Sequence, residues 1–292
     1  MSHLDASSVL QVIKIDINPV LVKIGPLSIH WYGVMYVVGI TVALFVVLPF
    51  AEQRGISRER ALEIFFPVVI AGLIGGRLYY VVQSNFGYYL THPLKILATW
   101  EGGMAFFGAI FASFLMILYL SWRKSLPFWS IMDTGALFAP LGQAFGRVGN
   151  IINGDIVGFR SNCAWCTQYI NPHSFPARHD VAYQPAAAYE LLISLAIFGV
   201  LYAFRFAPRR GGVLFAAYLM LYSISQFFIF FVRTEPFVAL GLKQAQLTAI
   251  VTFIFGAALF TYLFNRGPIL ARRSQAGQAQ PQSITPSASD AS

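Results

Sequence analysis

Hydrophobic residues along this chain gather into seven long runs that are separated by shorter polar segments. Each run is mostly apolar over about twenty residues, which is the length that an α-helix needs to cross a hydrocarbon core about 30 Å thick. The runs cover residues 30–50, 61–82, 102–122, 128–147, 186–204, 212–232 and 244–264. The pattern therefore predicts an all-α integral membrane protein with seven transmembrane helices.

Composition supports this class. Hydrophobic residues make up 57% of the chain and charged residues 11%, whereas roughly a quarter of the residues of a soluble domain are charged. The net charge of +8 lies mainly in segments that flank the apolar runs, with no basic patch interleaved with aromatic residues. Contacts of such segments with anionic lipid headgroups explain the charge. Membrane lipids are thus expected partners, and nucleic acid is not.

Lysine and arginine are distributed unevenly between the two sides of the predicted membrane domain. If the runs alternate in direction, one side receives Arg54, Arg58, Arg60, Arg123, Lys124, Arg205, Arg209, Arg210, Arg266, Arg272 and Arg273. The other side receives, over longer segments, Lys14, Lys23, Lys95, Arg160, Arg178, Arg233 and Lys243. Because short cytoplasmic loops are enriched in these residues, the amino terminus is predicted outside and the carboxyl terminus in the cytoplasm.

The connections between the runs differ in length and divide the chain into parts. The first residues contain Asp5 and Asp16 and lack a compact apolar segment with a cleavage site, so we do not expect a signal peptide. The connection after the fourth run is much longer than the others, which predicts a small exterior cap. The expected parts are an outward-facing segment 1–28, a membrane domain 29–265 that includes the exterior loop 148–185, and a basic, disordered cytoplasmic tail 266–292.

A pair of cysteines, Cys163 and Cys166, lies in the predicted exterior loop with His173 and His179 downstream. On an oxidising exterior face such a pair most simply forms a local disulfide. Free thiols are one alternative. A zinc site made of both cysteines and both histidines is another, although the spacing matches none of the familiar ligand patterns.

Two arginines, Arg147 and Arg77, lie at the rim of or inside an apolar run. A charge near hydrocarbon costs at least about 2 kcal/mol, so its default interpretation is a functional site that receives an anion. For Arg147, with Asn150 on the same face if the helix continues, we expect a lipid phosphate. The alternative is that Arg147 snorkels to the interface or pairs with Asp155.

Arg77 lies deeper in its run, beside Gly75 and Gly76. It is interpreted either as a second lipid contact or as a structural residue in an interhelical ion pair with Asp133 or Glu190.

Several motifs occur together in one order along the chain. They are His30-Trp31-Tyr32-Gly33, Gly75-Gly76-Arg77, Trp100-Glu101-Gly102-Gly103-Met104, the block Gly146-Arg147-Val148-Gly149-Asn150-Ile151-Ile152-Asn153-Gly154, Pro185 with Tyr189-Glu190, Tyr222, Arg233-Thr234 and Gln244-Ala245-Gln246. In this combination the chain resembles the prolipoprotein diacylglyceryl transferases, bacterial seven-span enzymes of lipoprotein maturation.

The resemblance implies a reaction. A diacylglyceryl group moves from phosphatidylglycerol to the lipobox cysteine thiol of a preprolipoprotein, in the bacterial cytoplasmic (inner) membrane. It also implies that phosphatidylglycerol is bound by Arg147, Arg77, Asn153, Gly154 and Arg233, and that the catalytic residues are Tyr32, Asn150 and Asp155. Tyr32 has an alternative interpretation as an aromatic anchor at the membrane interface. No cofactor and no metal are expected.

The chain departs from the family pattern at four positions. The family's histidine, arginine and glutamate are replaced by Phe107, Gln226 and Phe230, and Asp155 stands where the family usually has glutamate. The loss of an arginine together with its carboxylate partner is coherent, because either charge alone would be left buried and unpaired. These departures leave open a second hypothesis, a catalytically silent paralogue that binds anionic phospholipid or lipoprotein precursors.

Overall fold

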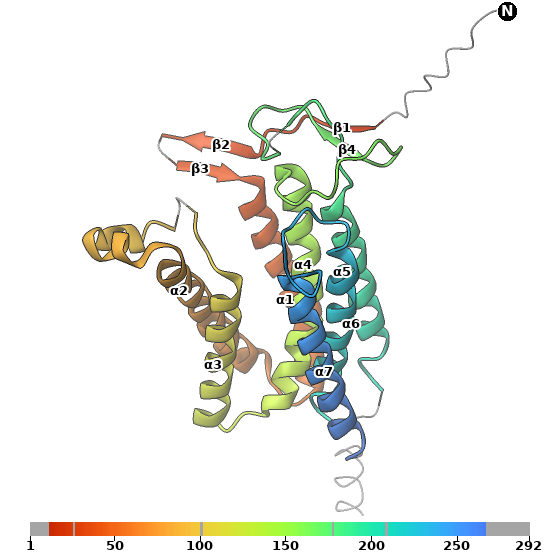
Figure 1. The fold of residues 1–292 in the computed structure, drawn as a ribbon. Coiled ribbons are helices and arrows are strands. Elements are labelled where there is room, and N and C mark those ends of the chain that lie inside the picture. Colours follow the sequence, from red (N-terminus) through yellow and green to blue (C-terminus); the bar gives the residue numbers. More distant parts are fainter. Residues whose placement is uncertain (1–11, 26, 100–101, 177, 208–209, 267–292) are drawn as a thin grey trace, which may run out of the picture.

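The computed structural model describes residues 12–25, 27–99, 102–176, 178–207 and 210–266. These residues contain one α-helix in each predicted apolar run and one short 3₁₀ helix, η1 (Pro93–Ile96). Figure 1 shows how the α-helices are arranged. The α-helices are α1 (Trp31–Gln53), α2 (Arg58–Thr91), α3 (Phe106–Arg123), α4 (Phe128–Asn153), α5 (Ala186–Ala203), α6 (Val213–Ile229) and α7 (Gln244–Phe264).

The helices suit a membrane, although not all of them to the same degree. Within the described residues α1, α2, α3, α5 and α7 are long and apolar enough to cross a bilayer, and α6 is a shorter apolar helix. The remaining helix, α4, has 26 residues and carries the charged side chains Asp133 and Arg147. The predicted helical membrane class is confirmed at this level.

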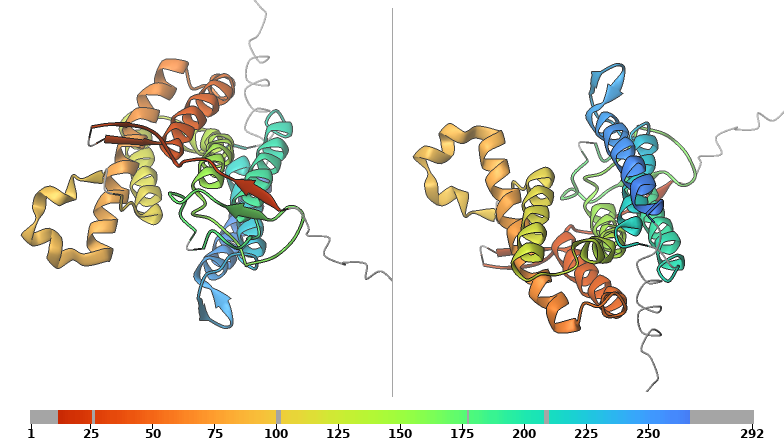
Figure 2. Two further views of the ribbon diagram at one scale, coloured as in Figure 1. Left: turned by 90° about the horizontal axis from the view of Figure 1, so that it is seen from above. Right: turned by 90° about the horizontal axis from the view of Figure 1, so that it is seen from below.

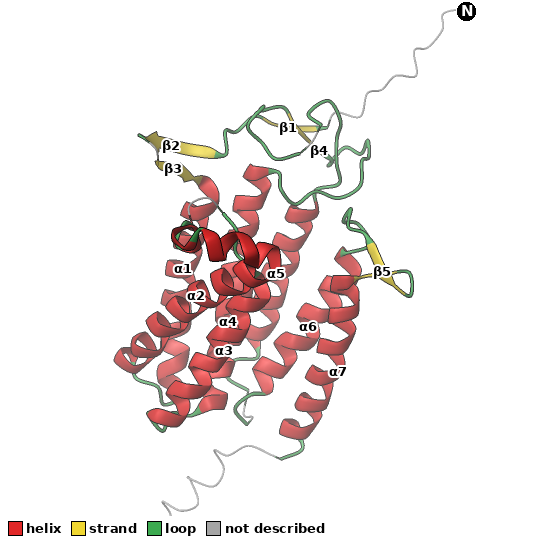
Figure 3. Ribbon diagram, turned by 60° about the vertical axis from the view of Figure 1, so that its left-hand side comes forward, coloured by secondary structure: helices red, strands yellow, loops and turns green. Residues whose placement is uncertain are grey.

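Short strands, which the sequence pattern did not predict, occur in three pairs within the described residues. The strand β1 (Ile13–Ile15) pairs in parallel with β4 (Thr167–Tyr169), β2 (Val20–Ile24) pairs with β3 (Leu27–His30), and β5 (Phe237–Ala239) pairs with β6 (Leu242–Lys243). The first two pairs and the loop 154–185 form a layer, here called the end layer, over one end of the helices (Figure 3).

Helix α4 lies at the centre of the main bundle, against α1, α5 and α6, and α7 packs on α6. Helices α2 and α3 form a separate hairpin beside this bundle (Figures 1 and 2). The principal buried cluster joins four helices and consists of Val47, Phe50, Ala136, Leu137, Ile197, Leu201, Leu214 and Tyr218. This part of the bundle is therefore apolar.

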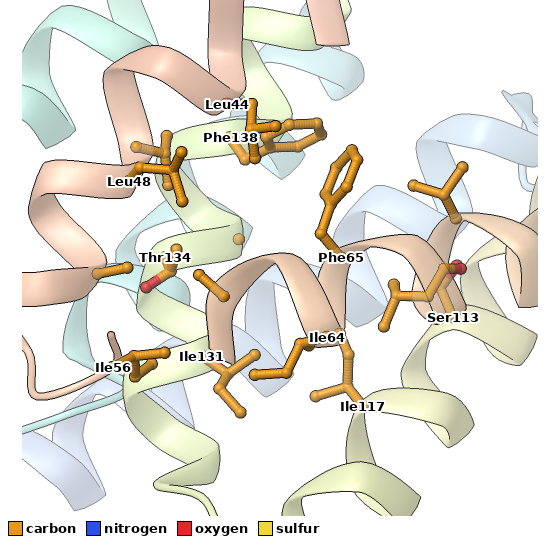
Figure 4. A pocket seen from close by; sticks show the side chains of 16 residues that line it. Leu44, Leu48, Ile56, Ile64, Phe65, Ser113, Ile117, Ile131, Thr134 and Phe138 are labelled. Carbon is orange, nitrogen blue, oxygen red and sulfur yellow. The ribbon is translucent and has the colours of Figure 1, made fainter. Parts of the chain in front are cut away.

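An apolar cavity of about 270 Å³ lies between the α2–α3 hairpin and helices α1 and α4. Figure 4 shows Phe65 of α2 and Phe138 of α4 at its wall. Its hydroxyls are already bonded, because Ser113 donates to the carbonyl of Val68 and Thr134 donates to that of Ser130. The cavity thus presents hydrocarbon, and the hairpin meets the bundle here through apolar contacts.

The two helices of the hairpin cross closely at a pair of glycines, Gly75 and Gly108. A Cβ atom on Gly75 would lie 2.2 Å from the Cβ of Ala112 and 2.6 Å from the carbonyl oxygen of Gly108. Small residues at such crossings let helix backbones approach, which is the usual basis of helix packing inside a membrane.

The substitution Gly75→Ala is therefore expected to lower the free energy of unfolding by about 1–3 kcal/mol, the usual cost of overpacking. The matched control is Gly135→Ala, because a Cβ on this α4 glycine meets no atom within 4 Å. Thermal unfolding in detergent compares the two proteins. Equal melting temperatures would show that the α2–α3 crossing tolerates a wider separation.

Candidate functional site

The candidate site lies at the carboxyl-terminal end of α4. The helix continues to Asn153, beyond the predicted run, so Arg147 and Asn150 do lie on one helical face. Gly154 then ends the helix with φ +74° and donates its N–H to the carbonyl of Asn150 at 2.8 Å. A Cβ at Gly154 would lie 2.8 Å from Tyr169 of the end layer. Glycine thus permits both the left-handed turn and the close contact.

The guanidinium of Arg147 is paired on two sides. Its Nη1 donates to Oδ1 of Asn150 at 3.0 Å, and its Nη2 forms an ion pair with Glu190. The amide Nδ2 of Asn150 in turn lies 3.1 Å from each carboxylate oxygen of Asp155. The predicted alternative of a direct Arg147–Asp155 pair is therefore wrong, because Asn150 stands between the two side chains.

Glu190, near the start of α5, is shared by two arginines. Its side chain is 3% exposed, and Nη1 of Arg233 lies 3.4 Å from its Oε1. Arg233 also donates to the carboxylate of Glu235 at 2.7 Å. The sequence indicated Glu190 as part of a motif, as a possible partner of Arg77 and as one candidate for a general base. Its pairing with Arg147 depends on the packing of α5 against α4, which has no local sequence signal.

Lys243, at the start of α7, is a second residue that sequence reasoning missed. It is 3% exposed, and its Nζ donates to the carbonyls of Phe230 and Arg233. This ammonium group fixes the chain that follows α6, and so it helps to place the backbone of Arg233.

Arg77 has a different environment. All five N–H donors of its guanidinium are bonded to backbone carbonyls of the segment between α2 and α3, namely those of Lys95, Ile96, Ala98, Gly102 and Gly103. The predicted ion pair with Asp133 or Glu190 is wrong. Asp133 instead lies 4.0 Å from Arg54 and accepts from the backbone N–H of Phe215.

Tyr32 lies in the first turn of α1, against the glycines of α4. A Cβ on Gly149 would lie 2.9 Å from the Cα of Tyr32. The Tyr32 hydroxyl donates to that of Tyr36 at 3.0 Å, and the phenol lies within electrostatic reach of Asp155 and Arg147. The structure thus brings Tyr32 to the same end of α4 as the charged cluster.

Asn153 and Asp155 complete this end of the helix. The Oδ1 atom of Asn153 is buried and accepts no hydrogen bond from the described residues. Burial raises the pKa of the Asp155 carboxyl above its ordinary value of 3.8, and the hydrogen bonds from Asn150 oppose this shift only in part. A carboxyl group whose pKa is raised in this way is a stronger proton acceptor than an ordinary aspartate.

Phe107 and Phe230, at two of the positions that depart from the family pattern, contact neighbouring side chains. Phe107 is 51% exposed on α3 and its ring contacts that of Phe106. Phe230 is buried, and its ring centroid lies 4.7 Å from the guanidinium carbon of Arg233. An aromatic face attracts a cation, so Phe230 supports Arg233 without adding a charge.

The cysteine pair forms a disulfide between Cys163 and Cys166. This confirms the first of the predicted states. Because both sulfur atoms are used in this bond, the alternatives of free thiols and of a zinc site that contains both cysteines are wrong.

Comparison with known proteins agrees with this arrangement. The sequence model described as prolipoprotein diacylglyceryl transferase matches residues 19–262. Among curated proteins, a phosphatidylglycerol–prolipoprotein diacylglyceryl transferase of Geobacter sulfurreducens is 33% identical over 258 residues, covering 86% of this chain and 96% of the relative. The protein of the same name from Bordetella parapertussis is 36% identical over 266 residues, covering 87% and 97%. The chain therefore belongs to the prolipoprotein diacylglyceryl transferase family.

Proposed function

We propose that this protein transfers the diacylglyceryl group of phosphatidylglycerol to the lipobox cysteine thiol in the signal peptide of a preprolipoprotein. The observation that carries the proposal is the cluster at the end of α4, where Arg147 and Arg233 share the carboxylate of Glu190. Two guanidiniums here meet one buried carboxylate, and the second carboxylate paired with Arg233, that of Glu235, is 43% exposed. The family membership and the names of the relatives support the same reaction.

The reaction needs positive charge where the leaving group departs. The thiolate sulfur of the lipobox cysteine forms a bond to the glyceryl carbon, and the bond from that carbon to the phosphate oxygen breaks. Glycerol phosphate leaves with the electron pair. Arg147 and Arg233 are 22% and 18% exposed, so they act where water is scarce and where preorganised charge stabilises a developing anion most strongly. A guanidinium also meets two phosphate oxygens at once.

The other side chains at the end of α4 supply proton transfer and hydrogen bonds. Asp155 takes the thiol proton, since only the thiolate is an effective nucleophile. Asn150 orients Asp155 and links it to Arg147. The unused acceptor of Asn153 receives a glycerol hydroxyl, and the hydroxyl of Tyr32 donates to a substrate oxygen. Arg77 contributes by fixing the segment between α2 and α3.

The proposal includes the placement in the membrane. All seven α-helices cross the bacterial cytoplasmic membrane, and the end layer forms an exterior cap. The amino terminus lies outside and the carboxyl terminus in the cytoplasm, as the distribution of Lys and Arg favours. The Cys163–Cys166 disulfide supports this orientation, because disulfides persist in oxidising compartments. The site then opens to lipid and signal peptides on the exterior side.

Incubation of the purified protein with labelled phosphatidylglycerol and a lipobox peptide tests the reaction. A labelled peptide–lipid thioether is expected, and a peptide with serine in place of the lipobox cysteine is expected to stay unlabelled. Binding of phosphatidylglycerol without any thioether would contradict the proposed transfer and support a silent lipid-binding protein.

The pH dependence of transfer is expected to report on Asp155. Because burial raises the pKa of this carboxyl, kcat/KM should increase with pH through a midpoint above 3.8, as the carboxylate forms. Asp155→Asn is expected to lower kcat roughly 100-fold, as for the loss of a general base. The increase of kcat/KM with pH should also disappear in this variant. If Asp155→Asn keeps both the wild-type kcat and the increase of kcat/KM with pH, Asp155 is excluded as the proton acceptor.

The same carboxyl gives a stability measurement that needs no turnover. With a raised pKa, the folded protein binds a proton more readily than the unfolded chain between the ordinary and the raised pKa. The free energy of unfolding contributed by Asp155 therefore falls as pH rises through this interval and is constant above it. Chemical unfolding at several pH values should show this fall in the wild type and its loss in Asp155→Asn.

A further inference from the structure

The disulfide lies in the end layer, and Trp165, one of the two residues between its cysteines, contacts the helix that carries Glu190. Trp165 donates from its indole Nε1 to the hydroxyl of Tyr189 at 2.8 Å, and this hydroxyl donates to Oε1 of Gln184 at 2.6 Å. Tyr189 immediately precedes Glu190 near the start of α5. The indole is 59% exposed, so its position depends on the turn that the disulfide closes.

The first turn of α5 has no capping side chain, and backbone hydrogen bonds hold its start, from Ala186 to Gln184 and from Ala188 and Tyr189 to Pro185. Its N-cap residue is Pro185, which provides no side-chain hydrogen bond to the helix. The free N–H groups of a helix start are usually stabilised by a capping side chain, which holds the first turn in place. The hydrogen-bonded chain Trp165–Tyr189–Gln184 adds a side-chain link from this turn to Gln184, just before Pro185, and to the loop that the disulfide closes.

A second path leads from the disulfide to the same place. Cys166 is fully buried and its carbonyl accepts from the N–H of Ile13 at 2.9 Å. Thr167, the next residue, exchanges two backbone hydrogen bonds with Tyr183, just before α5. In the same strand the Tyr169 hydroxyl donates to the carbonyl of Ile151 in the last turn of α4. The strand after Cys166 thus contacts both helices of the site.

We propose that the Cys163–Cys166 disulfide and Trp165 are positioning elements that hold Glu190 between Arg147 and Arg233, and that reduction of the disulfide lowers transfer. The inference rests on the proposed function, because it assigns the effect to that site. An added dithiol supplies two electrons and two protons to the bond, which becomes two thiols, while the dithiol becomes a disulfide. The released turn no longer fixes Trp165 against Tyr189, and the ion pairs of Glu190 lose their preorganisation.

The closed loop is short, so the disulfide contributes little to global stability through chain entropy. Loss of the disulfide should therefore displace the side chains of the site and leave the fold intact. This separates a positioning role from a structural one, because the two roles differ in their effects on kcat and on the melting temperature.

Two variants test the proposal in the full-length protein in phosphatidylglycerol nanodiscs. They are the double variant Cys163→Ser with Cys166→Ser, and Trp165→Phe, which keeps an aromatic ring and removes the indole donor. Each is expected to lower kcat roughly tenfold, in keeping with the sensitivity of catalysis to small displacements. The KM for the lipobox peptide and the melting temperature should change little. Trp122→Phe, at a tryptophan 78% exposed at the end of α3, is the matched control.

Hydrogen exchange provides a readout that does not depend on catalysis. The amides of Ala188 and Tyr189 donate to the carbonyl of Pro185 at 3.0 and 3.1 Å, so their exchange reports the opening of the first turn of α5. Exchange is expected to be faster in both variants and in reduced wild type. Unchanged exchange overturns the inference, whereas a wild type that forms no thioether overturns the proposed function. Equal kcat in an active wild type and both variants also refutes the positioning role.

Discussion

Replacement of Arg147 by alanine is expected to lower kcat/KM for diacylglyceryl transfer by about 1,000-fold, the upper range for the loss of one preorganised charge that stabilises a transition state. The expected loss is large because the side chain has two functions. In the proposed mechanism it provides positive charge for the departing phosphate, and in the structure it balances Glu190, whose carboxylate is 3% exposed. In Arg147→Ala, Arg233 is left as the only arginine paired with Glu190 among the described residues.

The substitution Arg147→Lys tests whether transfer needs only the positive charge of this side chain or also the planar shape of its guanidinium. Lysine keeps the positive charge and loses the planar fork, so it cannot meet Asn150 and Glu190 as the guanidinium does. Activity between those of Arg147→Ala and the wild type is therefore expected. The matched control is Arg160→Ala, an exposed arginine of the end layer, which should change kcat/KM by less than about twofold because an exposed charge contributes little.

The measurement is thioether formation from labelled phosphatidylglycerol over a range of lipid and peptide concentrations. Arg147→Ala with nearly wild-type kcat/KM would remove the basis of the proposed mechanism. A larger loss in Arg160→Ala than in Arg147→Ala would place the phosphate in the end layer instead.

The local features of the site could be predicted from sequence, because they depend on neighbours along the chain. Arg147 and Asn150 are three residues apart on one helix, and Gly154 follows as a helix end, so their side-chain order is a consequence of helical geometry. The pairing of Glu190 and Arg233 with Arg147 is different. These residues come from α5 and from the segment after α6, and only packing brings them together.

Arg77 shows why burial of a charge does not by itself define a ligand site. Its position inside an apolar run predicts a functional or paired arginine, and the side chain is indeed buried at 6% exposure. The partners are backbone carbonyls between α2 and α3. Carbonyl groups have no sequence signature, so a guanidinium that holds a loop and one that binds a lipid look alike in sequence.

With Gln226 and Phe230 in place of an arginine and a glutamate, the cluster has fewer charges than the family pattern. Other contacts hold Arg233 in place. Phe230 places its ring beside Arg233, and the nearby Lys243 holds the carbonyls of both residues. Position 230 therefore supports the arginine through its aromatic face. In the proposed mechanism the acid–base role falls to Asp155, on the opposite side of Asn150 from Arg147.

Glu190→Ala is expected to lower the free energy of unfolding by about 3–5 kcal/mol, because removal of one partner from a buried ion pair leaves an uncompensated charge. Here two guanidiniums lose the same partner, those of Arg147 and Arg233. Transfer should be lost as well, since the carboxylate that holds the two arginines together is then absent. Unfolding in detergent and thioether formation measure the two effects.

The matched control is Glu235→Ala. Glu235 also pairs with Arg233, at 2.7 Å, but its side chain is 43% exposed, and exposed pairs contribute only about 0–1 kcal/mol. Glu190→Gln tests the charge itself, since glutamine keeps the size and the acceptor oxygen and removes the negative charge. If Glu190→Ala and Glu235→Ala destabilise the protein equally, the buried carboxylate does not organise the two arginines. A stable but inactive Glu190→Gln would instead show that the charge of Glu190 orients the arginines for catalysis more than it stabilises the fold.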